Sequence, residues 1–114
     1  MNEFIDHLKD VFRLFGPFAA KRMFSGYGLF RDGLMFALVV RDTLYLKADA
    51  ESAPRFTQLG LLPFEYQRKG KVARLSYYAA PEAVMEDAAD ASKWAKLAFD
   101  AALRAHAARI RPRK

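Results

Sequence analysis

The chain has 114 residues, 53% of them hydrophobic, and this length and composition predict one domain with a single aromatic-rich core. The absence of cysteine excludes disulfides, thiolate catalysis and most structural zinc sites. The formal net charge of +6 is concentrated at the C-terminal end, where five basic residues and no acid follow Asp100. The rest of the chain is close to neutral, so a nucleic-acid hypothesis based on charge depends on this end or on local patches.

The first segment predicts an amphipathic helix over about residues 4–15. Apolar residues recur there at the spacing of one helix face, Asn2 is the expected N-cap, and Gly16-Pro17 is a stop signal. Charged residues interrupt every early apolar stretch, so no secretory signal is expected. The longest apolar run, residues 34–40, is too short to cross a bilayer. We therefore expect a cytoplasmic protein without a membrane segment.

From about Met23 the pattern changes to that of strands. Asp32-Gly33 predicts a two-residue hairpin turn, with the expected pairs Phe30–Met35, Leu29–Phe36 and Tyr27–Leu38. A second turn near Asp42-Thr43 gives a third strand at residues 44–47. In this register Leu44 and Leu46 share a face with Met35, Ala37 and Val39, and Tyr45 joins Phe36 and Leu38 on the other. Both faces are apolar, so each must be covered.

A short helix is expected at about residues 50–59, capped by Asp49 or Ser52 and ended by Gly60. A third hairpin then turns at Lys69-Gly70. Its expected pairs are Tyr66–Ala73, Phe64–Leu75, Leu62–Tyr77 and the opposite charges Glu65–Arg74. The fold class predicted from these elements is α+β: an antiparallel meander of about five strands, packed by an N-terminal helix, a short middle helix and a long C-terminal helix.

The last helix is predicted from about Asp90 to Ala108, with Asp87 or Asp90 as its cap. It is apolar around most of its circumference, which indicates burial against the sheet or pairing with another chain. Burial is the more frequent arrangement, and a homodimer contact is the alternative. The candidates for a dimer or partner contact are Phe99, Leu103 and Ile110. The expected organisation is one domain over residues 1–108 followed by a basic tail at residues 109–114.

No catalytic or metal site is predicted. Only His7 and His106 could act as a general base, and neither has a serine at helical spacing. Glu86, Asp87 and Asp90 precede a helix, where acids complement the dipole. The segment Ser25-Gly26-Tyr27-Gly28 lacks the following helix of a phosphate loop, so its glycines are assigned to a bulge or a close backbone approach. We expect neither an enzyme nor a cofactor.

Two groups of basic residues are candidates for nucleic-acid contact. Contacts of this kind to phosphate would be sensitive to salt and indifferent to sequence. Charges at a hairpin tip are more often simply solvated, and the C-terminal group is the stronger candidate. The tail group is Arg104, Arg109, Arg111, Arg113 and Lys114, and the hairpin group is Arg68, Lys69 and Lys71.

Several phrases in order resemble the N-terminal domain of the TfoX/Sxy-type competence regulators. The segment 22–28 is similar to the family's RMFGGxG opening, with Ser25 in place of its first paired glycine. Further similar phrases lie at residues 32–37, 44–47, 64–71, 76–82 and 94–98. The positions that carry the family motifs are Arg22, Met23, Phe24, Gly26, Gly28, Tyr45, Lys47, Tyr77, Tyr78 and Pro81.

The resemblance implies an α+β domain with an antiparallel sheet and a non-enzymatic role. For the founding regulators, that role is to promote transcription of DNA-uptake genes together with a cyclic-AMP receptor-type activator. Longer members carry a second, helical domain, whereas this chain ends in a short basic tail. We therefore expect a stand-alone domain that acts as a protein-interaction module in transcriptional regulation.

Two alternative functions follow from the residues. Two apolar sheet faces, and glycines beside Tyr27, could leave an aromatic-lined pocket for a small ligand. Direct nucleic-acid binding through the basic tail is the other alternative, and deletion of residues 109–114 should then abolish it.

Overall fold

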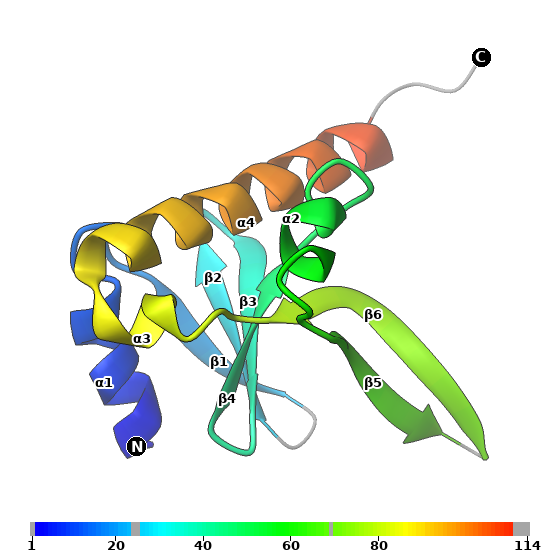
Figure 1. The fold of residues 1–114 in the computed structure, drawn as a ribbon, viewed down its shortest axis with the longest axis horizontal. Helices are drawn as coiled ribbons and strands as arrows, with labels where there is room; N and C mark the ends of the chain where they lie inside the picture. Colours follow the sequence, from blue (N-terminus) through cyan, green and yellow to red (C-terminus); the bar gives the residue numbers. More distant parts are fainter. Residues whose placement is uncertain (1, 24–25, 69, 111–114) are drawn as a thin grey trace.

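A six-stranded antiparallel sheet forms the centre of the molecule, in the order β1-β2-β3-β4-β6-β5 (Figure 1). The structure is a computed structural model, and it describes residues 2–23, 26–68 and 70–110. The strands are β1 (Ala19–Met23), β2 (Gly26–Arg31), β3 (Leu34–Val40), β4 (Thr43–Lys47), β5 (Pro63–Arg68) and β6 (Lys71–Ala79). The helices are α1 (Glu3–Val11), α2 (Ala53–Thr57), α3 (Ala83–Glu86) and α4 (Ala88–Ile110). The predicted α+β class is confirmed.

Helix α1 begins where predicted and ends earlier than predicted. Asn2 is the N-cap, and its side-chain oxygen accepts hydrogen bonds from the backbone N–H of Phe4, at 2.7 Å, and of Ile5. The helix ends at Val11, and a turn carries the buried rings of Phe12 and Phe15 into the core. The helical spacing of apolar residues therefore continues beyond the end of the helix, because the turn buries its side chains against the same core as the helix does.

Strand β1 was not predicted, because four of its five residues are exposed and it shows no apolar alternation. It pairs with β2 at the edge of the sheet, for example Lys21 with Gly28. The Nζ atom of Lys21 lies 4.9 Å from the centroid of the Phe30 ring. The second difference is in strand order, since β6 rather than β5 pairs with β4, through Leu46 and Tyr78.

The β2–β3 hairpin has the predicted turn and a bulge that was not predicted. Phe30 pairs with Met35 as expected, but Leu29 pairs with Ala37, which leaves Phe36 as an extra residue on β3. The predicted pairs Leu29–Phe36 and Tyr27–Leu38 are therefore wrong, and Tyr27 lies opposite Val39. The turn into β4 consists of Arg41 and Asp42, both with positive φ, one residue before the predicted turn.

The bulge changes which side chains share a face of the sheet. Phe36 joins Ala37, Val39, Leu44 and Leu46 in the main core, where it had been predicted on the opposite face. Met35 packs instead with the second cluster, formed by Leu38, Val40, Tyr77, Tyr45 and Phe64. Each face of the sheet carries an apolar cluster, as the sequence predicted.

Helices α1, α3 and α4 cover the main core, and α4 lies across the strands in Figure 1. Small residues make this approach close, because the side chains that α4 buries are Ala91, Ala95, Ala98, Ala101 and Ala102. Asp87 precedes α4 and accepts a hydrogen bond from the N–H of Asp90 at 3.1 Å, which confirms it as the cap. Helix α4 runs to Ile110, so Arg109, predicted for the tail, lies on the helix.

The β5–β6 hairpin extends away from the helices (Figure 1). Its predicted pairs Tyr66–Ala73 and Glu65–Arg74 are confirmed. A shift between Pro63 and Glu65 brings Pro63 opposite Tyr78, so the predicted Leu62–Tyr77 pair is wrong. Helix α2 is shorter than predicted, and its Phe56 ring stacks on Tyr78 at 5.2 Å. No helix in the described part of the chain is long and apolar enough to span a membrane.

Candidate functional site at the basic end of the last helix

The C-terminal turns of α4 lie beside β3, β4 and β6, and together they line an open cavity of about 170 Å³. Three of its lining residues carry polar groups: Lys47 of β4, Tyr77 of β6 and Arg109 of α4. Lys47 and Tyr77 are direct neighbours in the β4–β6 pairing. The other lining residues are Leu34, Met35, Ala102 and Ala105. Two family-motif positions and one predicted nucleic-acid contact therefore meet at one cavity, which we call the α4 cavity.

Lys47 is a partly buried cation in this cavity. Its Nζ atom donates a hydrogen bond to Oγ of Ser76 at 2.9 Å and lies 5.2 Å from the centroid of the Tyr77 ring. Burial lowers the pKa of Lys47, and the positive charge of Arg109 lowers it further, against the opposing effect of Asp49. The amine is thus held where its charged form is disfavoured.

Tyr77, a buried residue, also lines this cavity. Its side chain is 7% exposed, and its hydroxyl donates only a long hydrogen bond, 3.5 Å, to the carbonyl oxygen of Met35. Burial raises the pKa of Tyr77 to about 12, and the charge of Arg109 partly opposes this. The phenol therefore remains protonated and available as a donor at neutral pH.

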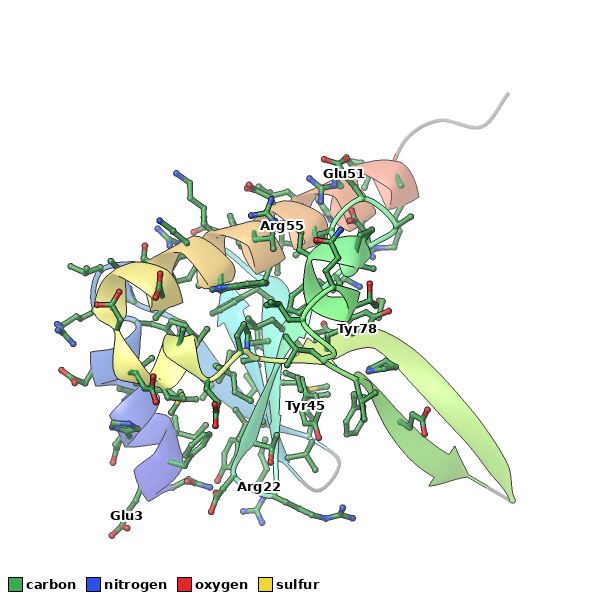
Figure 2. The ribbon with its side chains drawn as sticks, viewed as in Figure 1. Glu3, Arg22, Tyr45, Glu51, Arg55 and Tyr78 are labelled. Carbon is green, nitrogen blue, oxygen red and sulfur yellow. The ribbon has the colours of Figure 1, made fainter. Side chains whose placement is uncertain are left out.

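An ion-pair cluster, Arg104 with Asp49 and Glu51, ties α4 to the segment between β4 and α2. The guanidinium of Arg104 donates to both carboxylate oxygens of Asp49, at 2.6 and 3.0 Å, and lies 3.5 Å from the carboxylate of Glu51. Figure 2 shows Glu51 beside the end of α4. The hydrogen bonds from Arg104 lower the pKa of Asp49 to about 2, from an ordinary 3.8. Asp49 also accepts hydrogen bonds from the N–H and hydroxyl of Ser52.

Replacing Asp49 with asparagine should make the free energy of unfolding vary less with pH in the acidic range. The folded-state pKa of Asp49 lies below its unfolded value, so this carboxylate stabilises the fold fully above about pH 3.8 and loses that effect as pH falls through about 2. At neutral pH the change should cost about 1–2 kcal/mol, because the pair with Arg104 is partly exposed. Urea unfolding across this pH window measures both effects. Asp10→Asn, a carboxylate exposed on α1, is the matched control, and identical profiles for Asp49→Asn and wild type would contradict the assignment.

The predicted nucleic-acid residues do not form one surface among the residues that the structure describes. Arg104 is paired with Asp49 and Glu51, whereas Arg109 lines the α4 cavity. Arg68 and Lys71 pair through their backbones at the end of the β5–β6 hairpin. The remaining candidates, Lys69, Arg111, Arg113 and Lys114, lie outside the described residues.

The family-motif positions are distributed over both faces of the sheet. Arg22 is exposed on β1, as Figure 2 shows, and Met23 pairs with Gly26. Tyr45 packs its ring edge on Phe64 at 4.9 Å, on the face opposite the helices. Tyr78 stacks on Phe56 in the main core, Pro81 is buried before α3, and Phe24 lies outside the described residues.

The three predicted partner contacts differ in exposure. Phe99 is partly buried against the core, with its ring 6.4 Å from Phe15 and 5.7 Å from the guanidinium carbon of Arg31. Leu103 is 44% exposed and Ile110 is 67% exposed. These two residues are seven positions apart on α4 and therefore share one side of the helix. We call this pair the outer α4 surface.

The histidines considered for catalysis do not converge. His7 is exposed on α1 and His106 is partly exposed on α4. Within the described ranges no three His, Asp or Glu side chains come close enough together to hold a metal ion.

Sequence reasoning missed the Asp49–Arg104 pair, which joins residues 55 positions apart, and it considered Asp49 only as an alternative to Ser52 for the cap of α2, where the structure has Ser52. It also missed Ser76 as the partner of Lys47. A local pattern cannot reveal either contact, because the first depends on how α4 packs beside the segment after β4, and the second depends on the pairing of β4 with β6. The sequence singled out Lys47 as a motif position and Arg104 as a basic candidate, but not their partners.

The chain is similar to proteins that act in DNA transformation. The family described as TfoX N-terminal domain matches residues 10–102. The DNA transformation protein TfoX1 of Aliivibrio fischeri is 34% identical over 82 residues, which cover 68% of this chain and 39% of that protein. The DNA transformation protein TfoX of Haemophilus influenzae is 36% identical over 75 residues, which cover 64% of this chain and 35% of that protein. The chain thus aligns with well under half of the length of either relative.

Proposed function

The chain belongs to the TfoX N-terminal domain family, and on that premise we propose that it acts in DNA transformation as a non-enzymatic interaction module of transcriptional regulation. The family match over residues 10–102 carries the proposal, together with two relatives named as DNA transformation proteins. A cytoplasmic location accords with this role. The resemblance implies a cyclic-AMP receptor-type activator as the partner class.

The outer α4 surface is the region we assign to the partner. Leu103 and Ile110 expose apolar side chains on a helix that buries a different side through alanines. Exposed apolar residues that share one side of a helix are typical of helix-mediated contacts between proteins. Arg109 is exposed on the same terminal turn and could add charge complementarity to an acidic partner.

Deleting the gene should lower the frequency of transformation, and the wild-type chain supplied in trans should restore it. The double variant Leu103→Glu/Ile110→Glu should fail to restore it, because two carboxylates would have to be desolvated at the contact. Both positions are exposed, so the variant should unfold within about 0.5 kcal/mol of wild type, which excludes misfolding as the cause. Leu59→Glu/Leu62→Glu, which replaces two leucines exposed elsewhere, is the control.

Two results would refute this assignment. Transformation that is unchanged by the deletion would remove the functional proposal. Full rescue by the Leu103→Glu/Ile110→Glu variant would remove the outer α4 surface as the contact and leave the family role in place. Light scattering of the wild-type chain and of Leu103→Glu/Ile110→Glu distinguishes a second copy of the chain from a different partner. A homodimer contact would make the mass of the wild-type protein depend on its concentration.

A further inference from the structure

We propose that the α4 cavity binds a phosphate group, held between Lys47, Tyr77 and Arg109. This ligand is of a different class from the partner protein of the proposed function. The site would exist whether or not the domain acts in transformation, so the binding assay and the genetic assay can fail independently.

Two cations line one cavity without a carboxylate between them. Among the described residues, neither Lys47 nor Arg109 forms an ion pair, and Asp49, the acid whose charge acts on Lys47, is held by Arg104. A basic residue in the last turn of a helix commonly complements the helix dipole, which accounts for Arg109. The helix dipole does not account for Lys47, a partly buried lysine on the sheet that lines the same cavity. An anion between the two groups would relieve their mutual repulsion.

The donors of the cavity match the chemistry of a phosphate group. Arginine binds phosphate through several N–H groups, and lysine binds it as a point charge. Tyr77 is 7% exposed and its hydroxyl donates a hydrogen bond of 3.5 Å, so a closer acceptor would satisfy it better. Apolar residues, Leu34, Met35, Ala102 and Ala105, line the rest of the site, and charge interactions are stronger beside apolar groups than in bulk water.

The size of the cavity limits the ligand. Its volume of about 170 Å³ is smaller than the pockets of roughly 300–1,000 Å³ that hold drug-sized ligands. It can therefore accommodate a phosphate group. Such a group could come from a free phosphorylated compound or from the backbone of a nucleic acid, whose remaining parts would stay outside.

The test is a titration of the isotope-labelled full chain with inorganic phosphate, followed by nuclear magnetic resonance. We expect saturable shifts at Lys47, Tyr77 and the neighbouring Ala102 and Ala105. Lys47→Met and Arg109→Gln should each weaken the affinity roughly tenfold or more, because each removes a charged contact. Lys96→Gln, which removes an exposed charge from the same helix, is the matched control and should bind as wild type does. Tyr77→Phe should weaken binding by a smaller factor.

A second arm distinguishes the two sources of the phosphate. The arm measures the binding of duplex DNA to the wild-type chain and to both variants. A backbone phosphate lies in the cavity if inorganic phosphate displaces the DNA and if both Lys47→Met and Arg109→Gln weaken its binding. Phosphate binding without DNA binding supports a free phosphorylated compound. The proposal is overturned if phosphate causes no shifts at the cavity residues. It is also overturned if both variants unfold as the wild type does and still bind phosphate with wild-type affinity.

Discussion

Replacing Phe36 with alanine is expected to lower the free energy of unfolding by about 3–5 kcal/mol. The side chain is fully buried at the β2–β3 bulge, and its ring lies 5.1 Å from Phe15, 6.1 Å from Phe12 and 6.3 Å from Phe18. Truncation removes these contacts and leaves a cavity that the turn after α1 cannot fill. Because small domains are stable by only roughly 5–15 kcal/mol, the loss is a large part of the total. Urea unfolding measures the difference.

The matched control for this change is Leu62→Ala, which truncates a side chain that is 73% exposed. It should alter the free energy of unfolding by no more than about 0.5 kcal/mol. Had the predicted register without a bulge been correct, Phe36 would face Leu38 and Tyr45, away from Phe12 and Phe15. A small effect of Phe36→Ala would therefore contradict the bulge as well as the aromatic core.

Replacing Gly26 with alanine is expected to destabilise the domain by about 1–3 kcal/mol or more, as an inserted methyl group does in a closely packed site. A Cβ atom at Gly26, which pairs with Val40, would lie 1.9 Å from the carbonyl oxygen of Val39, so β2 and β3 would have to separate there. The obstacle is backbone, which cannot move aside as a side chain can. The close approach predicted for these glycines is thus confirmed at Gly26.

Gly28→Ala provides the comparison within the same motif. A Cβ atom there would come within 2.6 Å of the sulfur atoms of Met23 and Met35, which are the far ends of flexible side chains. These can rotate away, so Gly28→Ala should cost clearly less than Gly26→Ala. Thermal and urea unfolding of both variants give the ranking, and a larger effect at Gly28 would contradict the described geometry of β2.

Much of the fold could be predicted because the local signals agree with one another. Asn2 and Asp87 cap their helices, Asp32-Gly33 forms a hairpin turn, and Glu65 lies opposite Arg74 in the last hairpin, as predicted. The bulge at Phe36 gave no such signal, because the apolar run of β3 fits either face of the sheet. Strand β1 was missed because it has too few apolar residues, since an exposed edge strand needs no apolar alternation.

The candidate site was less predictable than the fold. Lys47, Tyr77 and Arg109 were each singled out by a family motif or by charge, but nothing in their spacing places them around one cavity. Their meeting depends on β6 pairing with β4 and on α4 remaining helical to Ile110. Both are long-range features, and neither is encoded in a short segment.

The most direct test of the regulatory role is the abundance of DNA-uptake gene transcripts in wild type, deletion strain and complemented strain. We expect these transcripts to fall on deletion and to return with the wild-type chain, but not with Leu103→Glu/Ile110→Glu. Transcripts that stay at the wild-type level in the deletion strain would contradict a role in transcription, whatever the effect on transformation itself.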